Sequence, residues 1–213
     1  DHCHLPGQGL TALAGKEPEA APCRLYLLSP PALDPAAFID VLAATLDAAD
    51  VACFQLYLCD ADDETYSAVA RALAPVCQER DVAFLLNARH HLVAATGADG
   101  VHVQGPVKGL RRKLPEGAIL GAGCGHSRHE AMEAGEAGAD YVSFGPWGPE
   151  AAEALTWWQL MMELPCVAAG GLDLDNAAAA KVAGADFVLL RSAVWNAPEG
   201  APAAAARAAA SIA

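Results

Sequence analysis

The stretch Gly97-Ala98-Asp99-Gly100-Val101-His102-Val103 returns twice along the chain in altered form. The later copies are Gly138-Ala139-Asp140-Tyr141-Val142-Ser143-Phe144 and Gly184-Ala185-Asp186-Phe187-Val188-Leu189-Leu190, spaced 41 and 46 residues apart. Glycine at the start of each copy is typical of a helix end, because it adopts the left-handed conformation at little cost. The apolar run after Ala-Asp is typical of a buried strand. Each spacing fits two consecutive strand–helix units.

Similar apolar runs, separated by Ala-rich segments with helical periodicity, occur along the rest of the chain. They predict further strands over 24–28, 51–57, 82–87, 118–124 and 166–170, with helices that include 34–49 and 62–79. The pattern therefore predicts eight strands and eight helices in strict alternation.

Continuous apolar strands joined by helices indicate a parallel sheet covered by helices. Eight such units fit an α/β fold of the closed (β/α)8 TIM barrel type, which places functional groups at the carboxyl ends of its strands. The alternative is an open doubly wound sheet, but no G-x-G-x-x-G turn follows the first strand. We expect one barrel domain over residues 23–213, preceded by an N-terminal extension over residues 1–22.

The composition limits the partners. The chain has 13 Lys and Arg against 26 Asp and Glu, a formal net charge of −13, which argues against a nucleic-acid partner. Charged residues interrupt every long apolar run, so no membrane span is expected. Seven cysteines without a C-x-x-C pair favour free thiols and a cytoplasmic location. Trp157 and Trp158 are expected to pack against the barrel, with a homodimer interface as the alternative.

The ends of the seventh and eighth predicted strands indicate a phosphate site. Gly170 and Gly171 allow an anion to approach the main chain closely, Ser192 follows the eighth strand, and Arg191 would add a bidentate partner. The alternative is that the glycines only form turns and that Arg191 pairs with a neighbouring carboxylate. We expect the ligand to be a small phosphate ester.

The other strand ends carry polar, small and aromatic residues, as the wall of a small-molecule pocket would. His126, after the fifth strand, is a candidate for catalytic proton transfer near neutral pH, or else a packed or solvated residue at a helix start. No metal ligands are predicted. The predicted substrate-binding residues are Gln55, Tyr57, Asn87, His102, Gln104, Gly145 and Trp147.

Several of these segments together resemble one known family. They are Leu25-Tyr26-Leu27-Leu28, Phe54-Gln55-Leu56, Leu85-Leu86-Asn87, the repeat copies at 97–103 and 138–144 with Gly145-Pro146, His126-Ser127, and Ala169-Gly170-Gly171. In these segments the chain resembles the thiamine phosphate synthases and their thiazole tautomerase relatives. For the synthases the resemblance implies magnesium-assisted coupling of a pyrimidine pyrophosphate to a thiazole phosphate. For the tautomerases it implies a metal-free proton transfer by a His at the position of His126.

The chain departs from the synthase pattern where that pattern implies pyrophosphate and magnesium ligands. An Arg and a Lys after the second strand are replaced by Tyr57 and Cys59, and the Asp of an Asn-Asp pair is replaced by Ala88. The Asp after the fourth strand is absent, and Glu150 lies in the segment where a Lys is implied. We therefore expect a divergent member that binds a thiazole phosphate and lacks a protein-held magnesium. The alternatives are a tautomerase acting through His126 and a non-catalytic binder of phosphates or thiamine precursors.

Overall fold

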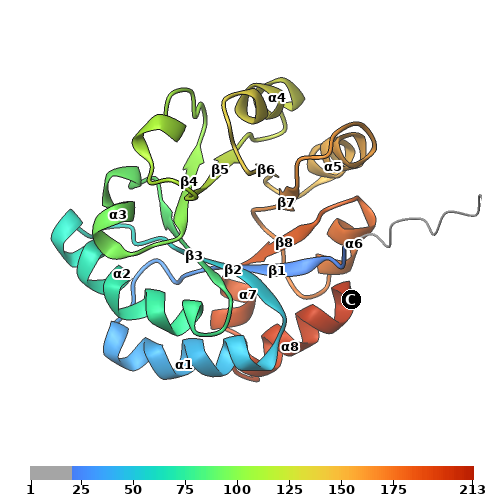
Figure 1. Ribbon diagram of the computed structural model, residues 1–213. Coiled ribbons are helices and arrows are strands. Elements are labelled where there is room, and N and C mark those ends of the chain that lie inside the picture. The colour runs from blue at the N-terminus through green and yellow to red at the C-terminus, as the bar shows by residue number, and fades with distance from the viewer. Residues whose placement is uncertain (1–20) are drawn as a thin grey trace, which may run out of the picture.

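The computed structural model describes residues 21–213, and the extension predicted over residues 1–22 lies almost entirely outside the described residues. Eight parallel strands close into a barrel in the order of the chain, with β1 paired to both β2 and β8 (Figure 1). The predicted (β/α)8 barrel is confirmed. The strands are β1 (Arg24–Leu28), β2 (Val51–Leu56), β3 (Ala83–Asn87), β4 (Gly100–Gln104), β5 (Ile119–Gly123), β6 (Tyr141–Phe144), β7 (Cys166–Ala168) and β8 (Phe187–Leu190).

Helices surround the barrel in the described part of the chain (Figure 1). Three of the described helices begin at a capping side chain: Asp34, Asp62 and Ser127 each accept a hydrogen bond from a backbone N–H of the first turn. The helices are α1 (Pro35–Ala48), α2 (Asp63–Gln78), α3 (Val93–Thr96) after the short 3₁₀ helix η1 (His90–Leu92), α4 (Arg128–Glu136), α5 (Pro149–Met161), α6 (Ala177–Val182), α7 (Ser192–Trp195) and α8 (Ala201–Ile212).

The prediction of strict alternation is wrong at one point. Between β4 and β5 the chain forms only a short 3₁₀ helix, η2 (Arg111–Lys113), whereas β8 is followed by both α7 and α8. Pro106, Gly109 and Pro115 interrupt the β4–β5 segment and prevent a regular α-helix there.

The aspartates of the three repeats explain why the Gly-Ala-Asp sequence recurs. The carboxylates of Asp99, Asp140 and Asp186 accept hydrogen bonds from the backbone N–H groups of Phe84, Leu120 and Cys166, at 2.8, 2.7 and 2.8 Å. Each aspartate thus ties the start of its own strand to the neighbouring strand, a fixed structural role in the barrel wall.

The core has two parts. Apolar side chains fill the layer between strands and helices, including Trp158, which is 1% exposed and packs edge-on against Phe144. The barrel interior holds a second cluster that contains the buried tyrosines Tyr26 and Tyr141. Within residues 21–213, no helix is long and apolar enough to cross a bilayer.

Candidate functional site

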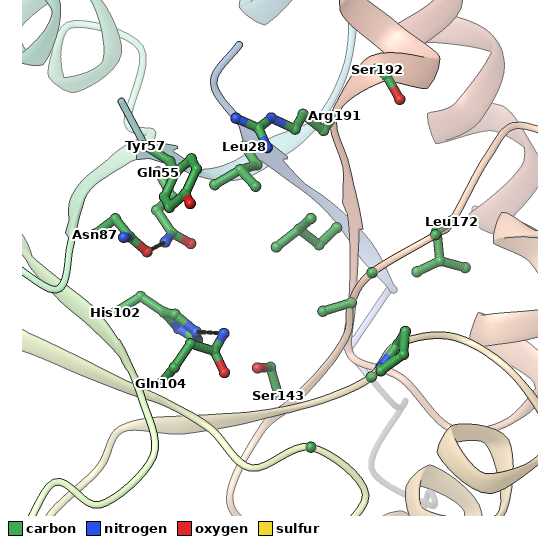
Figure 2. Close-up of a pocket in the computed structure, with 17 residues that line it drawn as sticks. Leu28, Gln55, Tyr57, Asn87, His102, Gln104, Ser143, Leu172, Arg191 and Ser192 are labelled. Atoms are coloured by element: carbon green, nitrogen blue, oxygen red, sulfur yellow. Dashed lines mark hydrogen bonds between the residues drawn. The ribbon is translucent and has the colours of Figure 1, made fainter. Parts of the chain in front are cut away.

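A cavity of about 600 Å³ lies at the carboxyl ends of the strands (Figure 2). It gathers ten of the predicted site residues: Gln55, Tyr57, Asn87, His102, Gln104, Gly145, Gly170, Gly171, Arg191 and Ser192. The other lining residues were not among the predicted site residues, although Pro146, Ala169 and Leu172 adjoin them: they are Leu28, Gly125, Ser143, Pro146, Ala169, Leu172 and Leu189. Ser143 had a readable signal, because it is a polar residue in the otherwise apolar strand β6 and shares the register layer of Gln104 through Gly123.

A chain of hydrogen bonds runs from one side of this cavity, through the barrel interior, to the other side. Its first half joins Asn87 to Tyr26: the Gln55 Nε2 donates to Asn87 Oδ1 at 2.8 Å, and the Tyr26 hydroxyl donates to Gln55 Oε1 at 2.8 Å. The two tyrosine hydroxyls then meet at 2.8 Å, and the hydroxyl of Tyr141 lies 2.9 Å from His102 Nδ1. The chain ends where Gln104 Nε2 approaches His102 Nε2 at 3.3 Å.

The direction of the chain fixes the tautomer of His102. Burial raises the pKa of Tyr26 and Tyr141 well above the usual value, so each hydroxyl keeps its one proton. Because Tyr26 donates to Gln55, Tyr141 must donate to Tyr26, and His102 must then donate to Tyr141 from Nδ1. Burial also lowers the pKa of His102 to about 4, so the ring is neutral at neutral pH. Its Nε2 therefore carries a lone pair and accepts from Gln104.

Glycines in β5 make room for this arrangement. A Cβ on Gly121 would lie 2.1 Å from the ring of Tyr141, so no larger residue fits there without displacing the tyrosine. Every hydrogen bond in the chain has the same donor-to-acceptor direction. The two ends of the chain therefore differ in the free group that they carry. Asn87 presents its Nδ2 donors and Gln104 presents its Oε1 acceptor, and neither atom has a partner among the described residues.

The glycine turn after β7 lies at the mouth of the cavity. Gly170 and Gly171 have φ angles of +76° and +75°, a left-handed conformation that other residues rarely adopt. Neither amide N–H donates a hydrogen bond to a described residue, and the carbonyl of Gly170 accepts from the amide of Trp147 at 2.6 Å. The turn therefore offers free backbone donors to an anion. The Trp147 side chain does not line the cavity and packs against the outer core.

Arg191 crosses the mouth from the end of β8. Figure 2 shows its side chain reaching toward Tyr57 and Leu28, whereas the side chain of Ser192 lies on the opposite side of β8. Its Nε donates to the carbonyl of Ser29 at 2.8 Å, and its guanidinium carbon lies 4.9 Å from the centre of the Tyr57 ring. The buried Nη2 has no hydrogen-bond partner, and no carboxylate pairs with Arg191 among the described residues. The alternative of a structural ion pair at Arg191 is therefore not observed.

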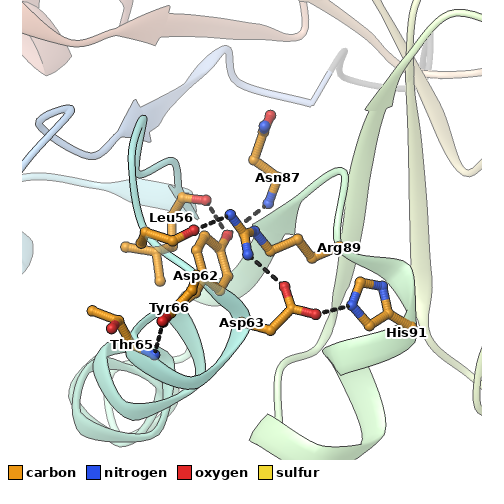
Figure 3. A network of polar contacts seen from close by, with 9 residues as sticks. Leu56, Asp62, Asp63, Thr65, Tyr66, Asn87, Arg89 and His91 are labelled. Atoms are coloured by element: carbon orange, nitrogen blue, oxygen red, sulfur yellow. Dashed lines mark hydrogen bonds and ion pairs between the residues drawn. The ribbon is translucent and has the colours of Figure 1, made fainter.

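A second arginine–tyrosine stack lies just outside the cavity (Figure 3). Arg89, after β3, lies 4.3 Å from the centre of the Tyr66 ring, donates to Asp63 at 2.5 Å and donates to the carbonyl of Ala61 at 2.6 Å. His91 also contacts Asp63, at 2.6 Å. The hydrogen bonds from His91 and Arg89 lower the pKa of Asp63. This stack is charge-compensated by its own neighbours.

His126 lies beside the cavity without lining it. Its side chain is 31% exposed, and both ring nitrogens face oxygen atoms: Nε2 lies 2.9 Å from the carbonyl of Pro146, and Nδ1 lies 3.0 Å from the carboxylate of Glu150. The structure therefore holds this imidazole between two acceptors at the start of α4 and α5.

The residues that line the cavity do not fit a magnesium ion held by the protein. Magnesium prefers carboxylate oxygens, yet the lining contains no Asp or Glu. The ends of β3 and β4 present amide side chains, from Asn87 and Gln104. In the described part of the chain, no group of three or more His, Cys, Asp or Glu residues could hold a metal ion.

The family model and the similar sequences agree on one family. A family model described as thiamine monophosphate synthase matches residues 25–194. The chain is 51% identical to a thiamine-phosphate synthase of Rhodospirillum centenum, covering 86% of this chain and 94% of that one, and 45% identical to one of Hyphomonas neptunium, covering 87% and 91%. Among solved structures, a thiamine phosphate pyrophosphorylase from Pyrococcus furiosus matches with a TM-score of 0.78 at 26% identity, covering 89% of this chain and 95% of that one.

Proposed function

This chain belongs to the thiamine monophosphate synthase family, and from that premise we propose that it binds a thiazole phosphate at the carboxyl face of its barrel. The observation that carries the proposal is the turn of Gly170 and Gly171, whose free N–H groups open on a cavity with polar walls. In this proposal the turn and Ser192 hold the phosphate group. The uncharged amide groups of Asn87, Gln55 and Gln104 and the neutral His102 contact the uncharged part of the ligand.

The cavity supports phosphate binding better than ordinary magnesium-assisted coupling. Its lining offers one cationic side chain, Arg191, and no carboxylate. A pyrophosphate leaving group carries several negative charges and is normally compensated by metal ions and basic side chains. We therefore expect slow formation of thiamine phosphate from the pyrimidine pyrophosphate and the thiazole phosphate. A coupled assay with both substrates, with and without magnesium, measures this directly, and rapid turnover would contradict the argument from missing ligands.

The phosphate site is tested with a matched pair of variants at Gly171. Asn and Asp both tolerate a left-handed conformation and differ mainly in charge. Gly171→Asp should lower the affinity for thiazole phosphate about tenfold or more relative to Gly171→Asn, because the carboxylate repels the phosphate. Isothermal titration with the unphosphorylated thiazole alcohol is the control, and its affinity should be the same in both variants. Equal affinities for the phosphate in the two variants would remove this turn from the site.

The tautomerase alternative is less well supported by the position of His126. A proton-transfer group must reach the ligand, and His126, which contacts the Pro146 carbonyl and the Glu150 carboxylate, does not line the cavity. Loss of tautomerisation of a thiazole carboxylate phosphate in His126→Ala, with phosphate affinity kept, would restore this alternative. The non-catalytic alternative predicts ligand binding with no turnover in either assay.

A further inference from the structure

We propose that Arg191, stacked on Tyr57, forms a second anion subsite in the cavity, separate from the glycine turn, for the phosphoryl group of a second phosphorylated ligand or leaving group. This inference rests on the proposed function only in that it assigns a further charged group to the same cavity. The argument starts from the charge state of Arg191, which is an obligate cation.

The first step is that the protein leaves this cation uncompensated. The other partly buried arginines of the described chain each pair with a carboxylate at 2.7 Å or less: Arg24, Arg80, Arg89 and Arg111 with an aspartate, and Arg128 with Glu153. Arg191 has only one hydrogen bond to a described residue, from Nε to the carbonyl of Ser29, and its Nη2 is buried without a partner. A buried donor without a partner costs about 1–3 kcal/mol, and more when it is charged. The guanidinium therefore keeps its positive charge and an unmet hydrogen-bonding capacity in a residue that lines the cavity.

The second step is that the guanidinium is held in place. The hydrogen bond from Nε to the Ser29 carbonyl holds one edge of the guanidinium, and the Tyr57 ring covers one of its faces. Ser29 is itself buried, and its hydroxyl bonds both to the carbonyl and to the amide of Tyr57. The stack is therefore anchored to the ends of β1 and β2, and Arg191 is held on the cavity wall, where an oxyanion can approach its positive charge.

The third step is that this position differs from the glycine turn. Figure 2 shows the Arg191 side chain directed across the mouth toward Tyr57, away from Ser192. The turn is on the β7 side, where Gly170 packs against Pro146. A ligand phosphate at the turn and a second phosphoryl group at Arg191 would therefore occupy two sides of one cavity. Arg191 would supply, from β8, a positive charge that the segment after β2 does not contain.

The test uses nuclear magnetic resonance of the full chain, with one signal for each subsite. The Nε–H signal of Arg191, identified by its loss in Arg191→Gln, reports the proposed subsite, and the Gly171 amide signal reports the turn. On titration with inorganic pyrophosphate, the Arg191 signal should shift and saturate. Pyrophosphate affinity should fall about tenfold or more in Arg191→Gln and by less in Arg191→Lys, which keeps the charge without the planar fork. Arg89→Gln is the matched control from the compensated stack, and its affinity should equal that of the wild type.

The two proposals fail in distinguishable ways. An Arg191 signal that does not move with pyrophosphate while the Gly171 amide does would overturn the second subsite and leave the phosphate turn intact. The reverse pattern would support the second subsite and remove the turn. Equal pyrophosphate affinity in the wild type and Arg191→Gln would also overturn the inference. The shift itself is read in the wild-type protein, and Arg191→Gln or Arg191→Lys serves to assign the Arg191 signal.

Discussion

Two arginines stack on tyrosine rings in this molecule, and their surroundings differ. Arg89 on Tyr66 is surrounded by Asp63 and the carbonyl of Ala61, whereas Arg191 on Tyr57 has one carbonyl and no carboxylate (Figures 2 and 3). The same contrast holds for the tyrosines. The Tyr66 hydroxyl donates to Leu56 at 2.5 Å and accepts from the amide of Asn87 at 3.0 Å, but the Tyr57 hydroxyl has no partner among the described residues.

The two stacks separate polar groups that satisfy one another within the fold from polar groups that we propose a ligand completes. The groups around Tyr66, like the hydrogen-bonded chain in the barrel interior, satisfy one another and should control stability. The groups at the mouth are incomplete, so removing them should cost little stability and much binding. Each of the following measurements can break that division.

The largest effect should be a loss of stability at acidic pH, caused by protonation of His102 in the hydrogen-bonded chain of the barrel interior. The folded state lowers the pKa of His102 from 6.5 to about 4, so the unfolded chain binds its proton first as the pH falls. The stabilisation is complete above pH 6.5 and is lost between pH 6.5 and 4, by up to about 3 kcal/mol. Urea unfolding at several pH values measures this loss. His102→Asn keeps a donor toward Tyr141 and cannot titrate, so its stability should vary less over that window; equal slopes in both proteins would show that another group is responsible.

The next effect should separate the two tyrosines. Tyr66→Phe leaves the carbonyl of Leu56 and the amide of Asn87 without the hydroxyl they share, and should lower the free energy of unfolding by about 2–3 kcal/mol. Tyr57→Phe removes a hydroxyl without a described partner and should change it by less than about 0.5 kcal/mol. Chemical denaturation of the two variants gives both numbers. A similar loss of unfolding free energy in the two variants would mean that the Tyr57 hydroxyl contributes as much to stability as the Tyr66 hydroxyl.

A smaller effect should separate the two arginines. Arg89→Met removes a stack and the bonds to Asp63 and Ala61, and should lower stability by about 1–2 kcal/mol. Arg191→Met removes one bond to Ser29 but also a buried donor without a partner, so its stability should stay equal to the wild type or rise. Thermal unfolding without ligand compares them. A clearly destabilised Arg191→Met would indicate a structural role for that guanidinium.

The smallest effect should appear in the stack at the mouth. Tyr57→Leu keeps an apolar side chain but removes the ring face under Arg191, and should weaken pyrophosphate binding about threefold to fivefold. Tyr57→Phe keeps the ring and should bind within twofold of the wild type. Titration calorimetry at constant salt resolves the difference. If the two variants bind alike, the ring only fills space.

The fold could be predicted in detail because its signals are local. The three Gly-Ala-Asp copies mark helix ends and strand starts, and β1 runs over the predicted Arg24–Leu28. The sequence pattern predicted a helix between β4 and β5, and this prediction was wrong. The count of strand–helix units did not take into account that Pro106 and Pro115 interrupt helix formation there. Ten predicted site residues line the cavity because strand ends converge in any parallel barrel.

What the sequence could not supply is the direction of side chains. Nothing in the order Leu190-Arg191-Ser192 shows that Arg191 turns toward Tyr57 and away from Ser192. His126 and Trp147 follow strand ends as the predicted site residues do, yet both lie outside the lining, because a loop residue can turn outward as easily as inward. The link from Gln55 to His102 needs Tyr26 and Tyr141 to meet across the barrel, and their separation in the chain hides that contact.

The one-way hydrogen-bonded chain from Gln104 to Asn87 also constrains how this cavity can diverge. Each of its six side chains can both donate and accept, so the polarity of the chain can reverse without a substitution, provided that the three amides, the two hydroxyls and the His102 tautomer all exchange together. A replacement of Gln55 or His102 by a residue that cannot make this exchange would hold the chain in one polarity. One substitution inside the barrel can therefore decide whether each end of the chain shows a donor or an acceptor to a ligand, whereas Tyr57 and Arg191 lie outside the chain and vary independently of it.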